Sequence, residues 1–221
     1  MDGYDRDAWE ERWARALREH GDRVARRPPN AHLVAATADL AAGRALDAGC
    51  GHGSETIWLA GRGWRVTAVD FAETALARGR ETAAGLGRDV AGRIEWIAAD
   101  LGDWTPPPEA FDLVISLHVH VAGSVEEAVA RMAGGVAPGG TLLMVGHRPV
   151  DPATGAPSAA AGQVQVSVEE ARSALDPARW DLLVAEERAR PAAPPGVDAV
   201  IRARRRKAAP GSARPQAATA R

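Results

Sequence analysis

Three glycines alternate with other residues in the run Asp47–Gly53, which lies between two segments of opposite patterning. The preceding segment, Arg44–Ala48, predicts a short β-strand, and Ser54–Ala60 predicts a helix. Because glycine has no side chain, such a loop leaves bare backbone that a ligand can approach closely. A strand, a glycine-rich turn and a helix are typical of nucleotide-type cofactor sites in parallel α/β sheets.

An acidic residue follows the glycine run at the spacing expected of a ribose-binding carboxylate. Asp70 ends the next apolar run, Trp64–Val69, and lies 21 residues after Gly49. An acid about 20 residues beyond such a turn accepts hydrogen bonds from the two vicinal hydroxyls of a ribose. The dinucleotide fingerprint requires a glycine at its sixth position, where this chain has Ser54. The motif therefore favours a ribose-bearing cofactor that has no pyrophosphate.

The remainder of the chain alternates between predicted helices and strands. Helices are expected at 72–84, from Ser124 and from Ser167 to Leu175, the last two opened by capping boxes with Glu127 and Glu170. Further strands are expected at 93–99, 111–119, 141–145, 180–188 and 197–206. This alternation predicts an α/β fold with a doubly wound, parallel sheet. The link before the last strand is too short for a crossover helix, so that strand should be antiparallel.

Three regions differ in composition. Residues 1–43 predict a helical cap, with Trp9 and Trp13 on one helical face and Asn30 as the N-cap of a second helix over 31–42. Residues 44–206 carry the alternating pattern. Residues 207–221 are low in complexity and basic, which predicts a disordered tail.

Composition excludes several classes of protein. A single cysteine excludes an internal disulfide and fits a reducing compartment. The polar, acidic start does not predict a signal peptide, and no apolar run predicts a transmembrane helix, so we expect a cytoplasmic protein without membrane contact. The last twenty residues hold seven basic side chains and no acid; without them the net charge of −2 becomes −9. Such an acidic body argues against a nucleic-acid substrate.

The order Asp-x-Gly-x-Gly-x-Gly, with Asp70 and Asp100-Leu101 downstream, resembles the class I S-adenosylmethionine-dependent methyltransferases. The resemblance covers 44–206 and implies a seven-stranded sheet with an antiparallel last strand. It also implies S-adenosyl-L-methionine as the cofactor and a small molecule as the methyl acceptor. The region 47–70 is loosely similar to the tellurite-resistance and thiopurine-type enzymes. The run Ser116-Leu117-His118-Val119 differs from the Asn-Pro-Pro-Tyr type of sequence, which argues against an amino-methylating enzyme of nucleic acids.

The resemblance implies a role for each of the three aspartates and for the glycine loop. Asp70 would bind the ribose, Asp100 the adenine amino group, and Asp47 the amino group of the cofactor. The glycines would contact the amino acid end, and Phe71 would lie against the adenine. The full set of expected cofactor residues is Asp47, Gly49, Gly51, Gly53, Asp70, Phe71, Asp100, Leu101 and Ser116.

Three histidines are candidates for the acceptor side. A general base is needed when the acceptor is a weak acid, and His118 and His120 end the fourth predicted strand on one face. We predict these two as catalytic, with His147 and Trp13 in the substrate pocket and 148–162 as a substrate loop. No third metal ligand is evident beside His118 and His120, so no metal site is predicted.

Two alternative functions share these features. A nicotinamide-dependent reductase would use the same ribose-binding acid but expects a glycine where Ser54 stands. A non-catalytic cofactor-binding protein on the same fold is compatible with the basic tail.

Overall fold

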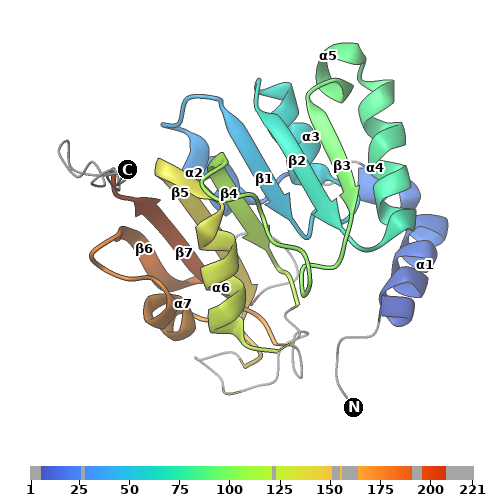
Figure 1. Cartoon of the computed structure of the whole chain (residues 1–221). Helices are drawn as coiled ribbons and strands as arrows, with labels where there is room; N and C mark the ends of the chain where they lie inside the picture. The colour runs from blue at the N-terminus through green and yellow to red at the C-terminus, as the bar shows by residue number, and fades with distance from the viewer. Residues whose placement is uncertain are drawn as a thin grey trace, which may run out of the picture.

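A seven-stranded sheet forms the centre of the computed structural model, which describes residues 6–25, 28–120, 123–150, 155, 164–190 and 196–207. The strands are β1 (Arg44–Ala48), β2 (Arg65–Asp70), β3 (Ile94–Ala98), β4 (Phe111–Leu117), β5 (Val136–His147), β6 (Trp180–Ala189) and β7 (Val197–Arg205). Their order in the sheet is β3-β2-β1-β4-β5-β7-β6 (Figure 1). The pairs from β3 to β5 are parallel, and β7 runs antiparallel to both β5 and β6. The predicted fold class is therefore confirmed.

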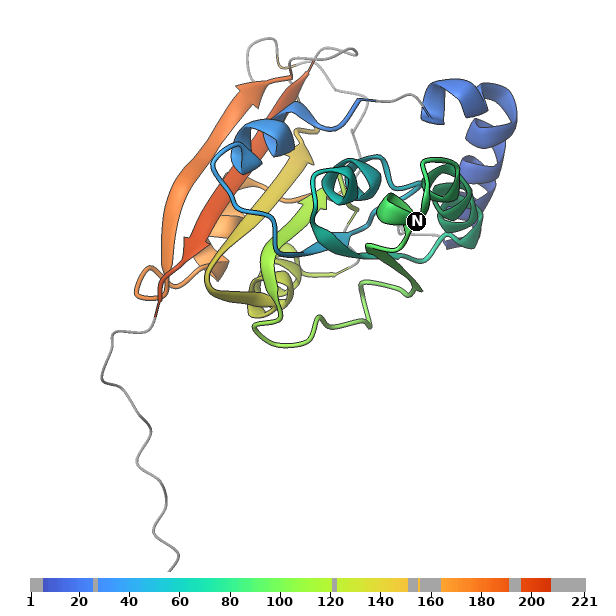
Figure 2. The same cartoon turned by 90° about the horizontal axis from the view of Figure 1, so that it is seen from above.

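Helices cover both faces of this sheet (Figure 2). They are α1 (Arg6–Ala25), α2 (Ala31–Thr37), α3 (Ser54–Gly61), α4 (Glu73–Gly85), α5 (Arg88–Ala91), α6 (Val125–Gly134) and α7 (Val168–Ala174). In β4, Val114 shares a buried cluster with residues of α6 and α7, whereas Leu113 and Ile115 share one with α2 and α3. All three are fully buried, which stabilises the fold by about 1.5–3 kcal/mol each. Burial on both faces explains why this strand is nearly continuously apolar in sequence.

Element boundaries differ from the prediction at several places. Helix α2 ends at Thr37 rather than near 42, and the Leu40 amide donates to the Thr37 carbonyl at 3.1 Å in the turn that follows. Strand β5 begins at Val136 rather than at 141, and a register shift between Phe111 and Leu113 of β4 accommodates the added residues. The four-residue helix α5 is too short for a periodic pattern to predict it. Ser124 makes one of the two capping-box bonds, whereas Ser167 makes both.

The end of β4 matters most for the site. The strand stops at Leu117, and His118 has a φ of +59°, so the chain turns out of the sheet before the predicted end at 119. The prediction that His118 and His120 share one strand face is therefore wrong. Backbone conformations of this kind in non-glycine residues are strained and concentrate at functional sites.

Some predictions fall outside the described residues. They include most of the predicted substrate loop at 148–162, the link at 191–195 and the tail from 208 onward. Within the described part of the chain, no helix is long and apolar enough to span a membrane.

Candidate cofactor and acceptor site

The glycine loop turns over the end of β2. Gly49, Gly51 and Gly53 have φ values of +82°, +53° and +80°, which side chains rarely tolerate. The Gly49 amide donates to the Val69 carbonyl at 2.8 Å and ties the loop to β2. A Cβ on Gly51 would lie 2.7 Å from the ring of Trp13. The alternating glycines thus meet conformational and packing requirements and leave a backbone cradle.

Asp70 lies directly beside this loop. Its Oδ2 accepts from the Gly51 amide at 2.8 Å, and its Oδ1 accepts from the Ala72 amide at 2.9 Å. Burial raises the pKa of this carboxyl, although the amide bonds oppose the shift. Each oxygen keeps a further lone pair, so the carboxylate can accept from two adjacent hydroxyls. This arrangement fits the ribose role predicted for Asp70.

Asp47 lies below the loop rather than on its surface. The side chain is 3% exposed and accepts from Thr56 Oγ1 at 2.6 Å. Burial, with a smaller contribution from the nearby Glu55 carboxylate, raises the pKa of Asp47 to about 7. Ser116, at the end of β4, is also buried.

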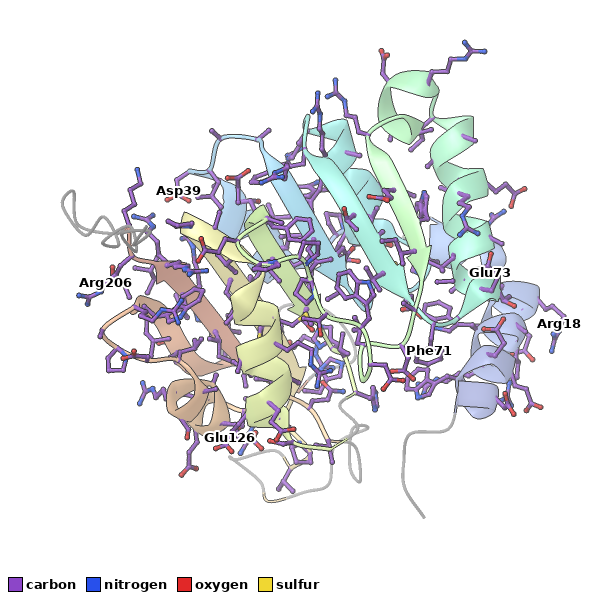
Figure 3. All side chains as sticks on the ribbon, in the orientation of Figure 1. Arg18, Asp39, Phe71, Glu73, Glu126 and Arg206 are labelled. Atoms are coloured by element: carbon purple, nitrogen blue, oxygen red, sulfur yellow. The ribbon has the colours of Figure 1, made fainter. Side chains whose placement is uncertain are left out.

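The remaining predicted cofactor residues follow neighbouring strands at the same edge. Phe71 follows β2 at the lower edge of the sheet in Figure 3 and is partly exposed. Asp100 follows β3, and its Oδ1 accepts from the Gly102 amide at 2.8 Å. Leu101 packs against the buried cluster beneath α6. The carboxyl ends of β1, β2 and β3 therefore bring a glycine cradle, two carboxylates and an aromatic ring together, which fits S-adenosylmethionine chemically.

Helix α1 lies over the glycine loop. The ring of Trp13 contacts Gly51 and lies 5.3 Å from the His52 ring, centroid to centroid. Glu10 accepts from the Thr74 amide at 2.9 Å and joins α1 to α4. Trp13 is thus placed beside the predicted cofactor residues, not beside His147.

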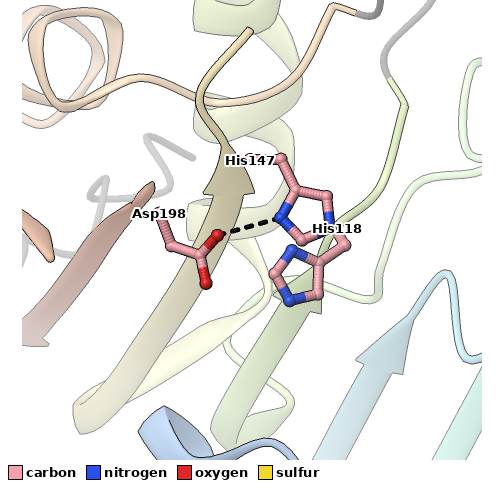
Figure 4. Close-up of side chains that lie close together, drawn as sticks. All are labelled: His118, His147 and Asp198. Atoms are coloured by element: carbon pink, nitrogen blue, oxygen red, sulfur yellow. Dashed lines mark hydrogen bonds and ion pairs between the residues drawn. The ribbon is translucent and has the colours of Figure 1, made fainter. Parts of the chain in front are cut away.

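A second group of polar side chains lies where β4, β5 and β7 meet. The rings of His118 and His147 stack with centroids 3.8 Å apart and planes at 22°. His147 Nδ1 lies 2.9 Å from Asp198 Oδ1, as Figure 4 shows. The antiparallel register places His147 directly opposite Asp198. His120 is not part of this stack; it lies edge-on to Trp9, with the ring centroids 4.7 Å apart, and faces Gln165.

The sequence interpretation missed Asp198. This carboxylate is 1% exposed, and besides His147 it contacts Arg190 at 3.0 Å and His32 at 3.8 Å. Burial alone would raise its pKa, but hydrogen bonds from His147 and Arg190 outweigh burial and lower the pKa to about 2. An acidic residue at the start of an otherwise apolar strand was the available signal.

The ligand atoms of His118, His147 and Asp198 lie within 4.8 Å of one another, close enough for a metal ion. The prediction of no metal site assumed that no third ligand was present, but Asp198 and His147 both lie close to His118. Two observations disfavour a metal here. Lone pairs of nearly parallel rings do not converge on one point, and the Arg190 guanidinium lies 2.7 Å from His147 Nδ1.

A cavity of about 510 Å³ opens beside His147, bounded also by Glu126, Arg148, Gln165 and Glu169 among the described residues. Its volume lies within the range of small-molecule sites. His147 therefore lies between the buried Asp198 and a space for an acceptor.

Comparisons with known proteins agree with this geometry. Residues 45–140 match the model of a methyltransferase domain family. Trans-aconitate 2-methyltransferase of Paracidovorax citrulli is 34% identical over 137 residues, which are 60% of this chain and 49% of that protein. The chain thus spans about half the length of this curated relative.

Two solved structures share the fold. An S-adenosylmethionine-dependent methyltransferase from Mesorhizobium loti has a TM-score of 0.62 at 23% identity and covers 80% of this chain and 99% of its own. A 1,6-didemethyltoxoflavin-N1-methyltransferase from Burkholderia thailandensis has a TM-score of 0.61 at 19% identity, covering 90% and 88%. The chain is therefore similar to methyltransferases over residues 45–140, and it shares the fold of S-adenosylmethionine-dependent methyltransferases over most of its length.

Proposed function

We propose that this protein transfers a methyl group from S-adenosyl-L-methionine to a small-molecule acceptor. The observation that carries the proposal is the Asp70 carboxylate, fixed by the Gly51 amide beside a cradle of three glycines. When bound, the cofactor supplies a methyl group already activated by a positively charged sulfur. The chain then has to bind, orient and shield the reactants, since positioning provides much of the acceleration in such displacements.

Each cofactor residue has a specific role in this proposal. Asp70 accepts from the ribose hydroxyls, and Asp100 accepts from the adenine amino group. The glycine loop contacts the amino acid end, above the buried pair of Asp47 and Thr56. Trp13 on α1 covers the loop and excludes water from it.

The small-molecule acceptor is supported by the cavity beside His147 and by the names of similar proteins. One is called a trans-aconitate methyltransferase, and another was solved with bound 1,6-didemethyltoxoflavin and S-adenosylhomocysteine. The acidic body of the chain opposes a nucleic-acid acceptor.

Calorimetric titration with S-adenosylhomocysteine tests the cofactor. Asp70→Asn should weaken binding by about 2–4 kcal/mol, since hydrogen bonds to a charged group contribute about 1.5–3 kcal/mol each. Asp103→Asn is the matched control, because this exposed acid lies near the same edge and should not change the affinity. Undetectable binding by the wild-type protein, or equal affinities for all three proteins, would refute the proposal.

The same titration separates the two alternatives. A nicotinamide-dependent reductase would bind NADH more tightly than S-adenosylhomocysteine. A non-catalytic cofactor-binding protein would bind S-adenosylhomocysteine but transfer no labelled methyl group to any acceptor offered.

A further inference from the structure

Two of the three histidines near the acceptor cavity have a ring nitrogen occupied by an amide donor. Asn30 is the N-cap of α2, and its Oδ1 accepts from the His32 amide at 2.8 Å. This bond fixes the orientation of the Asn30 amide, so its NH₂ group faces His118 Nε2 at 3.1 Å. An NH₂ group can only donate, so His118 Nε2 accepts, and the ring proton of His118 lies on Nδ1.

Gln165 fixes His120 in the same way. Its Oε1 accepts from the His147 backbone amide at 2.7 Å, which directs its NH₂ group toward His120 Nε2 at 3.4 Å. The lone pair of that nitrogen is therefore directed at a donor. Burial and the nearby Arg12 guanidinium lower the pKa of His120 to about 4, which makes it a weak base.

His147 has the opposite arrangement. Its Nδ1 lies 2.9 Å from Asp198 Oδ1, which can only accept, and 2.7 Å from Arg190 Nη2, which can only donate. The guanidinium already has an acceptor, because Arg190 donates to Asp198 Oδ1 through Nη2 at 3.0 Å and through Nε at 3.2 Å. A ring proton on Nδ1 therefore completes the bonds of the buried carboxylate without leaving the guanidinium unpaired. The carboxylate therefore accepts from the guanidinium and from the imidazole together. The unprotonated nitrogen of His147 is then Nε2.

We infer that His147, rather than His118 or His120, accepts the proton of the methyl acceptor, and that Asp198 is the positioning residue that holds its ring. This inference rests on the methyl-transfer function proposed above. His147 Nε2 takes the proton from the acceptor atom while that atom's electron pair forms a bond to the methyl carbon. The carbon–sulfur bond breaks at the same time, and its electron pair remains on sulfur.

The inference defines the class of acceptor. A proton acceptor is useful only when the methylated atom carries a proton at neutral pH, as a phenol or another hydroxyl does. A carboxylate is already ionised and needs no base. We therefore expect a hydroxyl-bearing acceptor, which differs in this respect from trans-aconitate.

Four charged side chains line the cavity with His147: Glu126 on α6, Glu169 and Glu170 on α7, and Arg148 after β5. The charged and titratable groups closest to its ring come from four other elements. Asp198 lies on β7, Arg190 follows β6, His118 follows β4, and His32 on α2 contacts the far oxygen of Asp198. The stacked His118 ring covers one face of His147 and fixes its plane. The imidazole is thus held by its neighbours, and His147 borders the cavity.

The tautomer of His147 can be measured without any acceptor. Long-range ¹H–¹⁵N spectra of histidine-labelled protein report which ring nitrogen carries the proton, and His147→Gln identifies the signal. We expect a protonated Nδ1 in the wild type and a changed pattern in Asp198→Asn. The control Glu186→Gln removes an exposed acid from β6 and should leave the pattern unchanged. A proton on Nε2, or stoichiometric binding of Co²⁺ by His118, His147 and Asp198, would overturn the inference.

Methyl transfer provides the second measurement. Phenol, benzoate and thiophenol are offered with methyl-labelled S-adenosylmethionine. We expect transfer to phenol, with kcat lowered about 10²–10⁴-fold in His147→Gln while S-adenosylhomocysteine affinity is unchanged. Asp198→Asn should also move the acidic limb of the kcat–pH profile, which a merely structural role would not do. Equal kcat in His147→Gln, or transfer to benzoate alone, would refute the inference, whereas loss of cofactor binding by the wild type would refute the proposed function.

Discussion

Asp47→Asn isolates the energetic effect of a buried carboxylate below the glycine loop. Asp47 is 3% exposed and accepts a hydrogen bond from Thr56 Oγ1 at 2.6 Å. Burial raises its pKa from 3.8 to about 7, with Glu55 adding to the shift. Asparagine has the same shape and still accepts from Thr56, but it cannot ionise.

The direction of the pH effect follows from the raised pKa. Because the folded protein binds the Asp47 proton more tightly than the unfolded chain, this group stabilises the fold fully only below about pH 4. That stability is lost as the pH rises toward 7. Each pKa unit corresponds to about 1.4 kcal/mol, so the whole window amounts to roughly 4 kcal/mol, and the part between pH 5 and 7 to roughly 2.7 kcal/mol.

Urea unfolding at pH 5, 6, 7 and 8 measures this effect. The free energy of unfolding of Asp47→Asn should rise relative to wild type by about 2–3 kcal/mol between pH 5 and 8. Asp70 also has a raised pKa, but it is present in both proteins and largely cancels in the difference. Asp103→Asn, at an exposed position, should show a constant difference. If the difference in the free energy of unfolding between Asp47→Asn and wild type is also the same at every pH, the pKa of Asp47 is not raised by burial.

Two pairs of substitutions test the local structure. Gly51→Ala should lower the free energy of unfolding by about 1–2 kcal/mol, because φ is +53° and the new Cβ would meet Trp13. Thermal unfolding measures this loss. The control is Gly61→Ala, whose new Cβ would have no neighbouring atom within 4 Å among the described residues. Ser167→Ala removes the two hydrogen bonds of the Ser167 hydroxyl, to the Glu170 amide and to the Glu170 carboxylate, and keeps the bond from the backbone amide of residue 167; it should destabilise the protein by about 1 kcal/mol. Ser124→Ala removes one bond and should destabilise it less, and an equal loss would contradict the capping argument.

The cofactor side of the site was predictable because its signals are local. The glycine spacing predicted a loop of bare backbone, where the structure has three positive φ values, and Asp70 followed from the end of one apolar run. Parallel strands place their carboxyl ends at one edge, so elements close in sequence also lie close in space. The boundary of β4 was not predictable in this way, because its apolar pattern continues through Val119 while His118 turns out of the sheet.

The acceptor side depends on pairing between distant segments. His147 meets Asp198 only because β7 pairs antiparallel with β5 in one register, and a shift of one residue would turn the carboxylate to the other face. The choice among three histidines depends on finer detail still. Asn30 and Gln165 each use their carbonyl oxygen on a backbone amide, which leaves only NH₂ groups for His118 and His120. The sequence alone offers three histidines as possible bases. The side-chain amides of Asn30 and Gln165 donate to two of them, and only His147 of the three has a carboxylate, Asp198, bonded to its ring.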